Sequence, residues 1–413
     1  MNNGGEKRIF LDYAAGTPTS EKAQAAYIAA LPYFANPQAL HTEGLEAARV
    51  RDDARSRIAR ILGVKSQELI FTSGGTEGNN LGIAGYLGAL EEQGISMKDC
   101  HALVTNIEHP SVTDVFAPFV ARGLQLTKVS PNEHGEIKPE TIKEALKEHT
   151  VLVSLAMVNS EIGTVQPLHA ISKVLKEHAP IVGTSTLEKV VLHTDACQGL
   201  YQSLVPQGLG VDLMTLDSGK MFGPRGTGVL YVRRGLSIAP VLRGGTQEQG
   251  LRPGTENIHL YAGFAAAFED AAELRASETE RLMDVRTALM EGLRKVIPDV
   301  LVNGDSKNQS PHILNISIPG INAEYVAMYL DQRGVALSTK SACLERNDAA
   351  QSHVVAALVQ AEKDRGGDVN QAWRASSTLR FSFGRDTLID DVPKIIEKVR
   401  DAVTTYRGFS FDS

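Results

Sequence analysis

Short apolar runs and longer amphipathic stretches follow one another along the first part of the chain. Apolar runs bounded by turn residues predict strands, and apolar residues three or four apart predict helices. The strands predicted up to Val232 span residues 8–12, 68–72, 101–105, 124–129, 151–158, 190–193, 211–216 and 228–232, and helices are predicted from Ser20, Glu43, Thr76, Ser111, Glu140 and Ile171. This alternation predicts an α/β fold with a mainly parallel sheet that helices cover on both faces.

The pattern changes after Glu256. Residues 260–293 form one long run rich in Ala, Glu, Leu and Arg, which predicts a long helix. Beyond it, predicted strands at 312–318 and 379–383 and helices at 322–333 and 388–406 indicate a small α+β unit. We therefore expect a large domain spanning residues 20–258 and a small one made of residues 1–19 and 259–413.

Composition narrows the class of protein. The chain has 413 residues, 42% of them hydrophobic, which is enough to fill two cores. Its net charge of −7 is spread without long runs of one sign, so nucleic acid is not an expected direct partner. No apolar stretch approaches the roughly 20 residues of a membrane span, and the first residues lack the apolar core of a signal peptide. We expect a cytoplasmic protein without a membrane partner.

The cysteines are few. Cys100, Cys197 and Cys343 are an odd and sparse set, which argues against a disulfide framework and against a metal site. At most one of them is expected to be chemically special.

Lys220 is the first candidate for chemistry. The predicted strand 211–216 runs through Asp217, Ser218 and Gly219 into Lys220, and a glycine-rich segment follows. Open α/β sheets place their chemistry on loops after strands, and a lysine held among apolar and glycine neighbours can lose its proton and attack a carbonyl. Lys220 is therefore a Schiff-base candidate, and the alternative is an ordinary surface lysine.

Two further elements agree with this interpretation of Lys220. Asp195 ends the predicted strand 190–193, and an acid and a lysine at consecutive strand ends suit pyridoxal phosphate, whose ring nitrogen needs a carboxylate. The glycine-rich turn at 71–80, with Gly75 and Thr76, leads from a strand into a helix whose N-terminus could hold a phosphate. Together, in this order, the three elements indicate a pyridoxal phosphate site.

With these motifs the chain resembles the cysteine desulfurases of the NifS/IscS type, in the class V aminotransferase group of pyridoxal-phosphate enzymes. The matching segments, in order, are residues 11–15, Asn36–Pro37 with His41, 72–80, Glu108–His109, 158–163, Asp195 with Gln198, Lys220, 252–255, 341–343 and 380–385. The resemblance implies a type I, aspartate-aminotransferase-like pyridoxal-phosphate transferase fold. Such a fold has a mainly parallel seven-stranded sheet and a smaller α+β domain.

The resemblance also implies roles for individual residues. Lys220 would hold the aldehyde, His109 would stack on the pyridine ring, Asp195 would meet its nitrogen and Gln198 its phenolic oxygen. Thr76, beside Gly75, would hold the phosphate. Thr255 from a second copy would join it there, so a homodimer is implied.

Substrate recognition requires a grip on the carboxylate of an amino acid, for which a bidentate arginine is the natural group. Arg380 matches the family's arginine for this task, and a structural ion pair is the alternative. By resemblance, Asn159 supports Arg380 and the phenolic oxygen of the cofactor.

The chain departs from the family just before the lysine. The family's turn reads Ser-Gly-His-Lys, whose serine and histidine contact the phosphate, whereas this chain reads Asp217-Ser218-Gly219-Lys220. An ionised Asp217 would repel a phosphate. Three arrangements remain open: the carboxylate turns away, it pairs with a cation such as Arg225, or Ser218 takes over the contact. We expect the cofactor to bind, held less tightly than is usual in the family.

Cys343 separates desulfurases from other members of the group. A polar stretch follows it, and Lys340 and Arg346 nearby would favour its thiolate form. The alternative is a buried structural cysteine. The resemblance implies that L-cysteine becomes L-alanine and that its sulfur passes to Cys343 as a persulfide. An acceptor protein, such as an iron–sulfur cluster assembly scaffold or a tRNA-thiolation enzyme, would then receive it.

Other readings stay open at this point. They are a selenocysteine lyase, a desulfhydrase, an aminotransferase, or a catalytically weak scaffold for sulfur transfer. Cys197 stands where the family commonly has threonine, and residues 362–370 resemble an insertion.

Overall fold

A mixed sheet forms the centre of the larger part of the molecule. The computed structural model describes residues 7–183, 185–304, 307–339, 351–367 and 370–409. Seven strands lie in the order β2 (Leu69–Thr72), β10 (Gly228–Val232), β9 (Leu213–Asp217), β8 (Val191–Asp195), β5 (Thr150–Ala156), β3 (His101–Thr105) and β4 (Gln125–Val129). Only β10 runs against its neighbours, so the other six strands end at one edge. The predicted mainly parallel, seven-stranded α/β sheet is confirmed.

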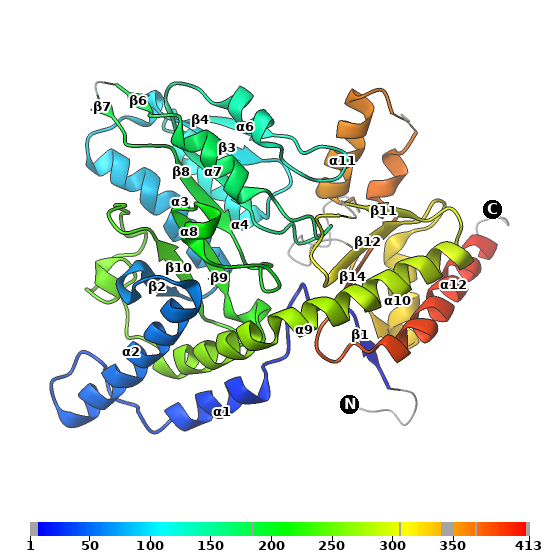
Figure 1. Ribbon diagram of the computed structural model, residues 1–413, viewed down its shortest axis with the longest axis horizontal. Helices are drawn as coiled ribbons and strands as arrows, with labels where there is room; N and C mark the ends of the chain where they lie inside the picture. The colour runs from blue at the N-terminus through cyan, green and yellow to red at the C-terminus, as the bar shows by residue number, and fades with distance from the viewer. Residues whose placement is uncertain (1–6, 184, 305–306, 340–350, 368–369, 410–413) are drawn as a thin grey trace.

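Both faces of this sheet are buried. Leu69 and Phe71 of β2 belong to one apolar core, whereas Ile70 between them belongs to another. The helices of this part are α1 (Glu21–Ala30), α2 (Thr42–Leu62), α3 (Gly75–Glu92), α4 (Pro110–Thr113), α5 (Ala117–Val120), α6 (Pro139–Ala145), α7 (Leu168–Lys176) and α8 (Pro206–Leu209). A hairpin of β6 (Ile181–Val182) and β7 (Ser185–Thr186) lies at its margin (Figure 1).

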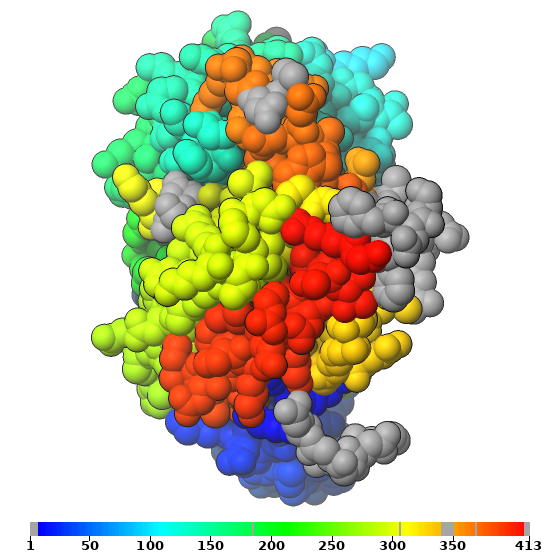
Figure 2. All heavy atoms as spheres, turned by 90° about the vertical axis from the view of Figure 1, so that its right-hand side faces the viewer, coloured from blue at the N-terminus to red at the C-terminus, as the bar shows by residue number. Residues whose placement is uncertain are grey.

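One long helix connects the two parts of the molecule. Helix α9 (Ile258–Val296) packs on α1 and α2 and also on α12 (Val392–Phe409), and Figure 1 shows it extending from the larger part into the smaller one. The smaller part has an antiparallel sheet of β11 (Leu301–Asn303), β12 (Ile313–Ser317) and β14 (Thr378–Ser382), with α10 (Ala323–Gln332) and α11 (His353–Asp364). In Figure 2, α12 (red) lies between α9 (yellow-green) and α10 (gold). The domain boundary at residues 258 and 259 stays a prediction.

The N-terminal strand joins the smaller part. β1 (Ile9–Phe10) pairs in parallel with β13 (Val335–Ala336). β1 is shorter than the strand predicted over residues 8–12. Helix α11 was not predicted, because its surroundings in the sequence are polar. Val354, Val355 and Leu358 nevertheless form an apolar face, which packs against Ile107 and Ile162.

The helix predicted after Ser111 is broken. It consists of α4, a 3₁₀ turn at residues 114–116 and α5, because Pro118 lacks the N–H that a continuous helix would need at that position. Among the described helices, none is both long and apolar enough to cross a lipid bilayer.

Candidate active site

A cavity of about 190 Å³ lies at the edge where the strands end. The residues that follow β2, β3, β5, β8 and β9 all contribute to it, as the parallel order of these strands requires. Of the predicted site residues, it brings together Gly75, Thr76, His109, Asn159, Asp195, Gln198, Lys220 and Arg380. Eight residues that the sequence marked as site candidates therefore lie around one cavity.

Lys220 ends a tight 3₁₀ turn, η4 (Ser218–Lys220), directly after β9. Its Nζ donates to the carbonyl oxygen of Ala15 at 2.5 Å. Gly223 lets the chain fold back beneath the turn, since a Cβ there would lie 2.1 Å from Ser218 Oγ. The turn therefore presents the amine of Lys220 to the cavity on a rigid support.

Asp195 and His109 are joined by a hydrogen-bond network. Asp195 Oδ1 accepts from the backbone N–H of Cys197 at 2.9 Å, and its Oδ2 accepts from Asn79 Nδ2 at 2.8 Å. Asn79 also donates to Ser111 Oγ at 3.0 Å, and that hydroxyl lies 2.8 Å from His109 Nδ1. The carboxylate and the imidazole are therefore oriented by a shared chain of polar groups.

Sequence reasoning missed Asn79 and Ser111. Asn79 lies one helical turn after Gly75 and is fully buried on α3, which is an unusual place for an amide. A polar residue one turn into a helix that begins at a predicted phosphate turn was an available signal.

Gln198 is oriented from the smaller part of the molecule. Its Nε2 donates to the carbonyl oxygen of Ala14 at 2.9 Å, and its Oε1 lies 3.1 Å from His312 Nε2. Burial, followed by the charge of Arg380, lowers the pKa of His312 to about 3, so its ring is neutral. The other ring nitrogen of His312 lies 2.7 Å from Ser310 Oγ. The second N–H of the Gln198 amide is left for the cavity.

Arg380 is nearly inaccessible, with 2% of its surface exposed. It donates to the carbonyl oxygen of Ser160 at 3.0 Å and to Asp12 Oδ1 at 2.8 Å, whereas its buried Nε has no partner. A guanidinium carries five N–H donors, so Arg380 keeps donors for an anion. Asn159 accepts from the N–H groups of Glu161 and Ile162 and so fixes the loop that presents the Ser160 carbonyl.

Two predicted residues that the structure describes, Ser218 and Thr255, do not line this cavity. Ser218 Oγ is buried without a partner and lies against Gly223. Ser218 therefore does not line the cavity, which contradicts the expected arrangement in which it takes over the phosphate contact. Thr255 is exposed, and its contact with a second copy stays a prediction. Cys343 lies outside the described residues, as do Lys340 and Arg346.

Asp217 does not turn away from the cavity. Its carboxylate lines the cavity and accepts hydrogen bonds from the N–H groups of Gly75 and Gly219, at 3.0 Å and 2.8 Å. Asp217 therefore caps α3, whose preceding residue, Gly74, has no side chain to do so.

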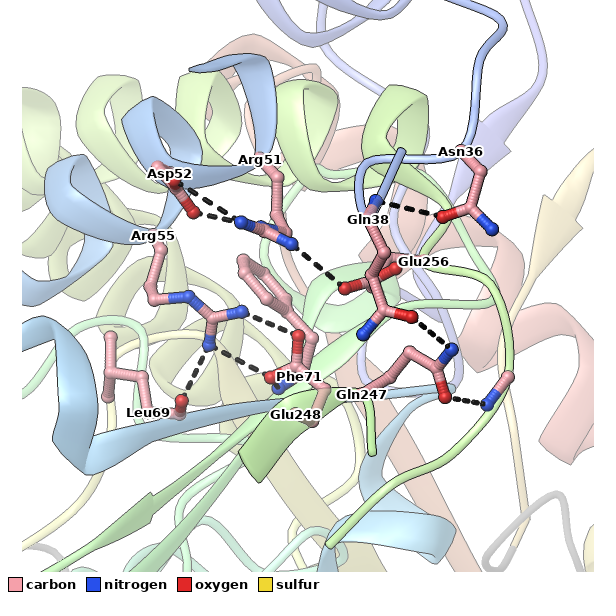
Figure 3. Close-up of polar contacts among 11 residues, drawn as sticks. Asn36, Gln38, Arg51, Asp52, Arg55, Leu69, Phe71, Gln247, Glu248 and Glu256 are labelled. Carbon is pink, nitrogen blue, oxygen red and sulfur yellow. Dashed lines mark hydrogen bonds and ion pairs between the residues drawn. The ribbon is translucent and has the colours of Figure 1, made fainter. Parts of the chain in front are cut away.

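A polar network holds the loop that carries Thr255 (Figure 3). Arg55 donates twice to Glu248, at 2.8 Å and 2.5 Å, and once to the carbonyl oxygen of Leu69. Glu248 also accepts from the N–H of Phe71 at 2.8 Å. The loop is thereby tied to β2, the strand that leads into the turn at Gly75. Arg55 and Glu248 are 193 positions apart, so no local sequence signal linked them.

Glu108, next to His109, carries a pH prediction. Burial raises the pKa of its carboxyl group from 4.5 to about 7, and Oε2 has no partner. A raised pKa in the folded state gives stability that is fully present below the unfolded value of 4.5 and is lost as pH rises through about 7. Glu108→Gln removes this loss, so we expect it to raise the free energy of unfolding by about 3 kcal/mol at pH 8 and by less than about 1 kcal/mol at pH 5.

Urea unfolding of both proteins at the two pH values measures this difference. Equal effects of the substitution at pH 5 and pH 8 would contradict a titrating Glu108.

Comparison with known proteins agrees with this arrangement. The model of the family "Aminotransferase class-V" matches residues 9–395. A cysteine desulfurase IscS of Dictyoglomus turgidum is 35% identical over 408 residues, covering 96% of each chain. A mitosomal cysteine desulfurase of Encephalitozoon cuniculi is 33% identical, covering 98% of this chain and 89% of its own. A solved NifS-like protein superposes with a TM-score of 0.84 at 26% identity, covering 96% of this chain and all of its own.

The likeness extends over nearly the whole length, and the matched family model spans every strand and loop that lines the cavity. The chain belongs to the class V aminotransferase family, within its NifS/IscS-type cysteine desulfurases.

Proposed function

We propose that this chain is a pyridoxal-phosphate-dependent cysteine desulfurase, which converts L-cysteine to L-alanine and passes the sulfur to Cys343 as a persulfide. The observation that carries the proposal is that Lys220 and Arg380 line the same small cavity. An amine that can hold a cofactor aldehyde and a guanidinium that can bind a carboxylate are the two groups that an amino-acid substrate requires there. The names of the relatives supply the choice of L-cysteine.

The donor set fits the ring and the aldehyde of pyridoxal phosphate. Lys220 offers the amine, Asp195 a carboxylate for the ring nitrogen, and His109 an imidazole for the ring face. Thr76 and the start of α3 offer donors for the phosphate. Gly75 lets the start of α3 lie against Cys197, since a Cβ there would lie 2.8 Å from Cys197 Sγ. When bound, the cofactor supplies an aldehyde for amino groups and a ring that accepts electrons.

The side chains then divide the work. Arg380 binds the substrate carboxylate and so orients the Cα–H bond, and the freed amine of Lys220 removes that proton. Asp195, held by Asn79 and the N–H of Cys197, keeps a proton on the ring nitrogen. The Cys343 thiolate attacks the substrate sulfur, so that an S–S bond forms and the C–S bond breaks. The three-carbon product takes up one proton at Cβ, regains the proton that Lys220 removed from Cα, and leaves as alanine.

A homodimer with Thr255 reaching the partner's phosphate site completes the proposal. Phe34 and Leu40, in the connection between α1 and α2, are 81% and 91% exposed, as a surface covered by another chain would be. Gln247 on the Thr255 loop donates to Gln38 in this connection at 2.9 Å (Figure 3), so the apolar residues and Thr255 share one surface.

We propose a cytoplasmic enzyme that passes sulfur to an acceptor protein of iron–sulfur assembly or tRNA thiolation.

Alanine formed from L-cysteine by the full chain with pyridoxal phosphate and a thiol reductant tests the proposal. We expect Cys343→Ala to lower the rate at least about 100-fold, since the nucleophile is removed. Cys100→Ala is the matched control, because burial raises the pKa of that thiol to about 12 and keeps it out of the chemistry. Undiminished alanine formation by Cys343→Ala would contradict the persulfide route, and sulfide with pyruvate as products would indicate a desulfhydrase.

A further inference from the structure

The carboxylate of Asp217 occupies the end of the cavity where the cofactor's phosphate is expected. Asp217 is the last residue of β9 and lines the cavity together with Thr76 and Lys220. Its Oδ2 accepts from the N–H of Gly75, the first residue of α3, and its Oδ1 accepts from the N–H of Gly219. The Asp217 side chain thus occupies two backbone N–H donors, one at the start of α3 and one in the turn that carries Lys220.

Two cations, Lys220 and Arg225, lie near Asp217. Lys220 donates to the carbonyl oxygen of Ala15, and the exposed Arg225 extends toward Gly16, where a Cβ would lie 3.0 Å from its Nη2. In the part of the chain that the structure describes, neither cation is paired with Asp217. Cys197, which also borders Gly75, adds no charge, because burial, with the charges of Asp195 and Asp217, raises its pKa well above the usual value.

A phosphate held by Thr76 at the start of α3 would therefore meet a negative charge within a few ångströms. Like charges repel at that distance, and the N–H of Gly75 is already taken. At the other end of the cavity, Lys220 and Asp195 would hold the aldehyde and the ring nitrogen, and these contacts do not involve the phosphate. The cavity therefore favours the cofactor at one end and disfavours it at the other.

We propose that Asp217 determines cofactor specificity by weakening the hold on the phosphate, so that the chain discriminates little between pyridoxal phosphate and phosphate-free pyridoxal. The inference rests on the proposed function, because it takes this cavity as the cofactor site. It assigns to Asp217 a role that is separate from the reaction at the lysine.

Equilibrium dialysis of the full-length apoprotein against pyridoxal phosphate and, separately, pyridoxal tests the proposal. The quantity compared is the ratio of the two dissociation constants, pyridoxal over pyridoxal phosphate. We expect Asp217→Asn and Asp217→Ser to raise this ratio at least about tenfold, by tightening the binding of the phosphate form alone. Asparagine keeps an oxygen that can accept from one N–H, so the cap on α3 survives in that variant.

Glu77→Gln is the matched control. Glu77 lies in the same first turn of α3, but its carboxylate accepts from the N–H of Ser73 and pairs with Arg252 instead of lining the cavity. We expect this variant to leave the ratio unchanged. An unchanged or lowered ratio in both Asp217 variants would overturn the inference while leaving the proposed function intact. If wild type and variants bind neither compound, the proposed function itself fails, and the inference fails with it.

Discussion

Lys220→Ala should reduce alanine formation from L-cysteine by about four orders of magnitude or more. The substitution removes both the amine that holds the cofactor aldehyde and the base that moves the Cα proton, and each role is worth a large factor in rate. Among the described residues that line the cavity, Lys220 is the lysine, and its Nζ donates to the carbonyl oxygen of Ala15. The measurement is the rate of alanine release by the purified full chain.

A second readout separates loss of chemistry from loss of folding. Borohydride fixes the cofactor to whichever amine holds it, so the wild-type chain should retain the cofactor after denaturation and the variant should not. Lys128→Ala, at an exposed position on β4, controls for the loss of a lysine in general. Retention of the fixed cofactor by the Lys220 variant would mean that another lysine holds it, and the assignment would be wrong.

The second large effect is expected at Arg380. Arg380→Lys keeps a positive charge but loses the planar fork, so we expect kcat/KM for L-cysteine to fall by about 100-fold or more. Most of the change should be in KM, because the lost contacts are made by the bound substrate as well as by the transition state. Initial rates over a range of L-cysteine concentrations measure this, and the binding of pyridoxal phosphate should stay within about threefold.

The same sequence motif supplies a control. Arg385 lies five positions from Arg380 but pairs with Asp270 and stacks on Phe222, outside the cavity. Arg385→Lys should therefore lower the melting temperature without raising KM. An unchanged KM in the Arg380 variant would assign that side chain to the structural pair with Asp12 alone.

The sequence predicted the residues whose place depends on local chain order. Asp195 ends β8 and Lys220 follows β9, and parallel strands end at a common edge, so their meeting needs no knowledge of side-chain packing. The long helix α9 was likewise predicted, from its run of Ala, Glu, Leu and Arg, within a few residues at each end.

What escaped prediction depends on contacts between distant segments. The bond between Asn79 and Asp195 joins residues 116 positions apart, and the support of Gln198 by His312 joins residues 114 apart. The direction of the Asp217 carboxylate is a choice among rotamers that the packing of α3 against β9 decides. Helix α11 was missed because its apolar face is short and lies within a polar stretch.

The segment that contains Asp12 and Ala15 bears on how the protein is made. Asp12 receives a hydrogen bond from Arg380, 368 positions later, and Ala15 binds the amine of Lys220, 205 positions later. A ribosome releases the N-terminal segment first and Arg380 near the end, so the cavity cannot close until synthesis is almost complete. Contacts of such sequence separation also slow folding. Nascent chains that stop short of β14 should therefore build much of the central sheet and still lack a finished active site.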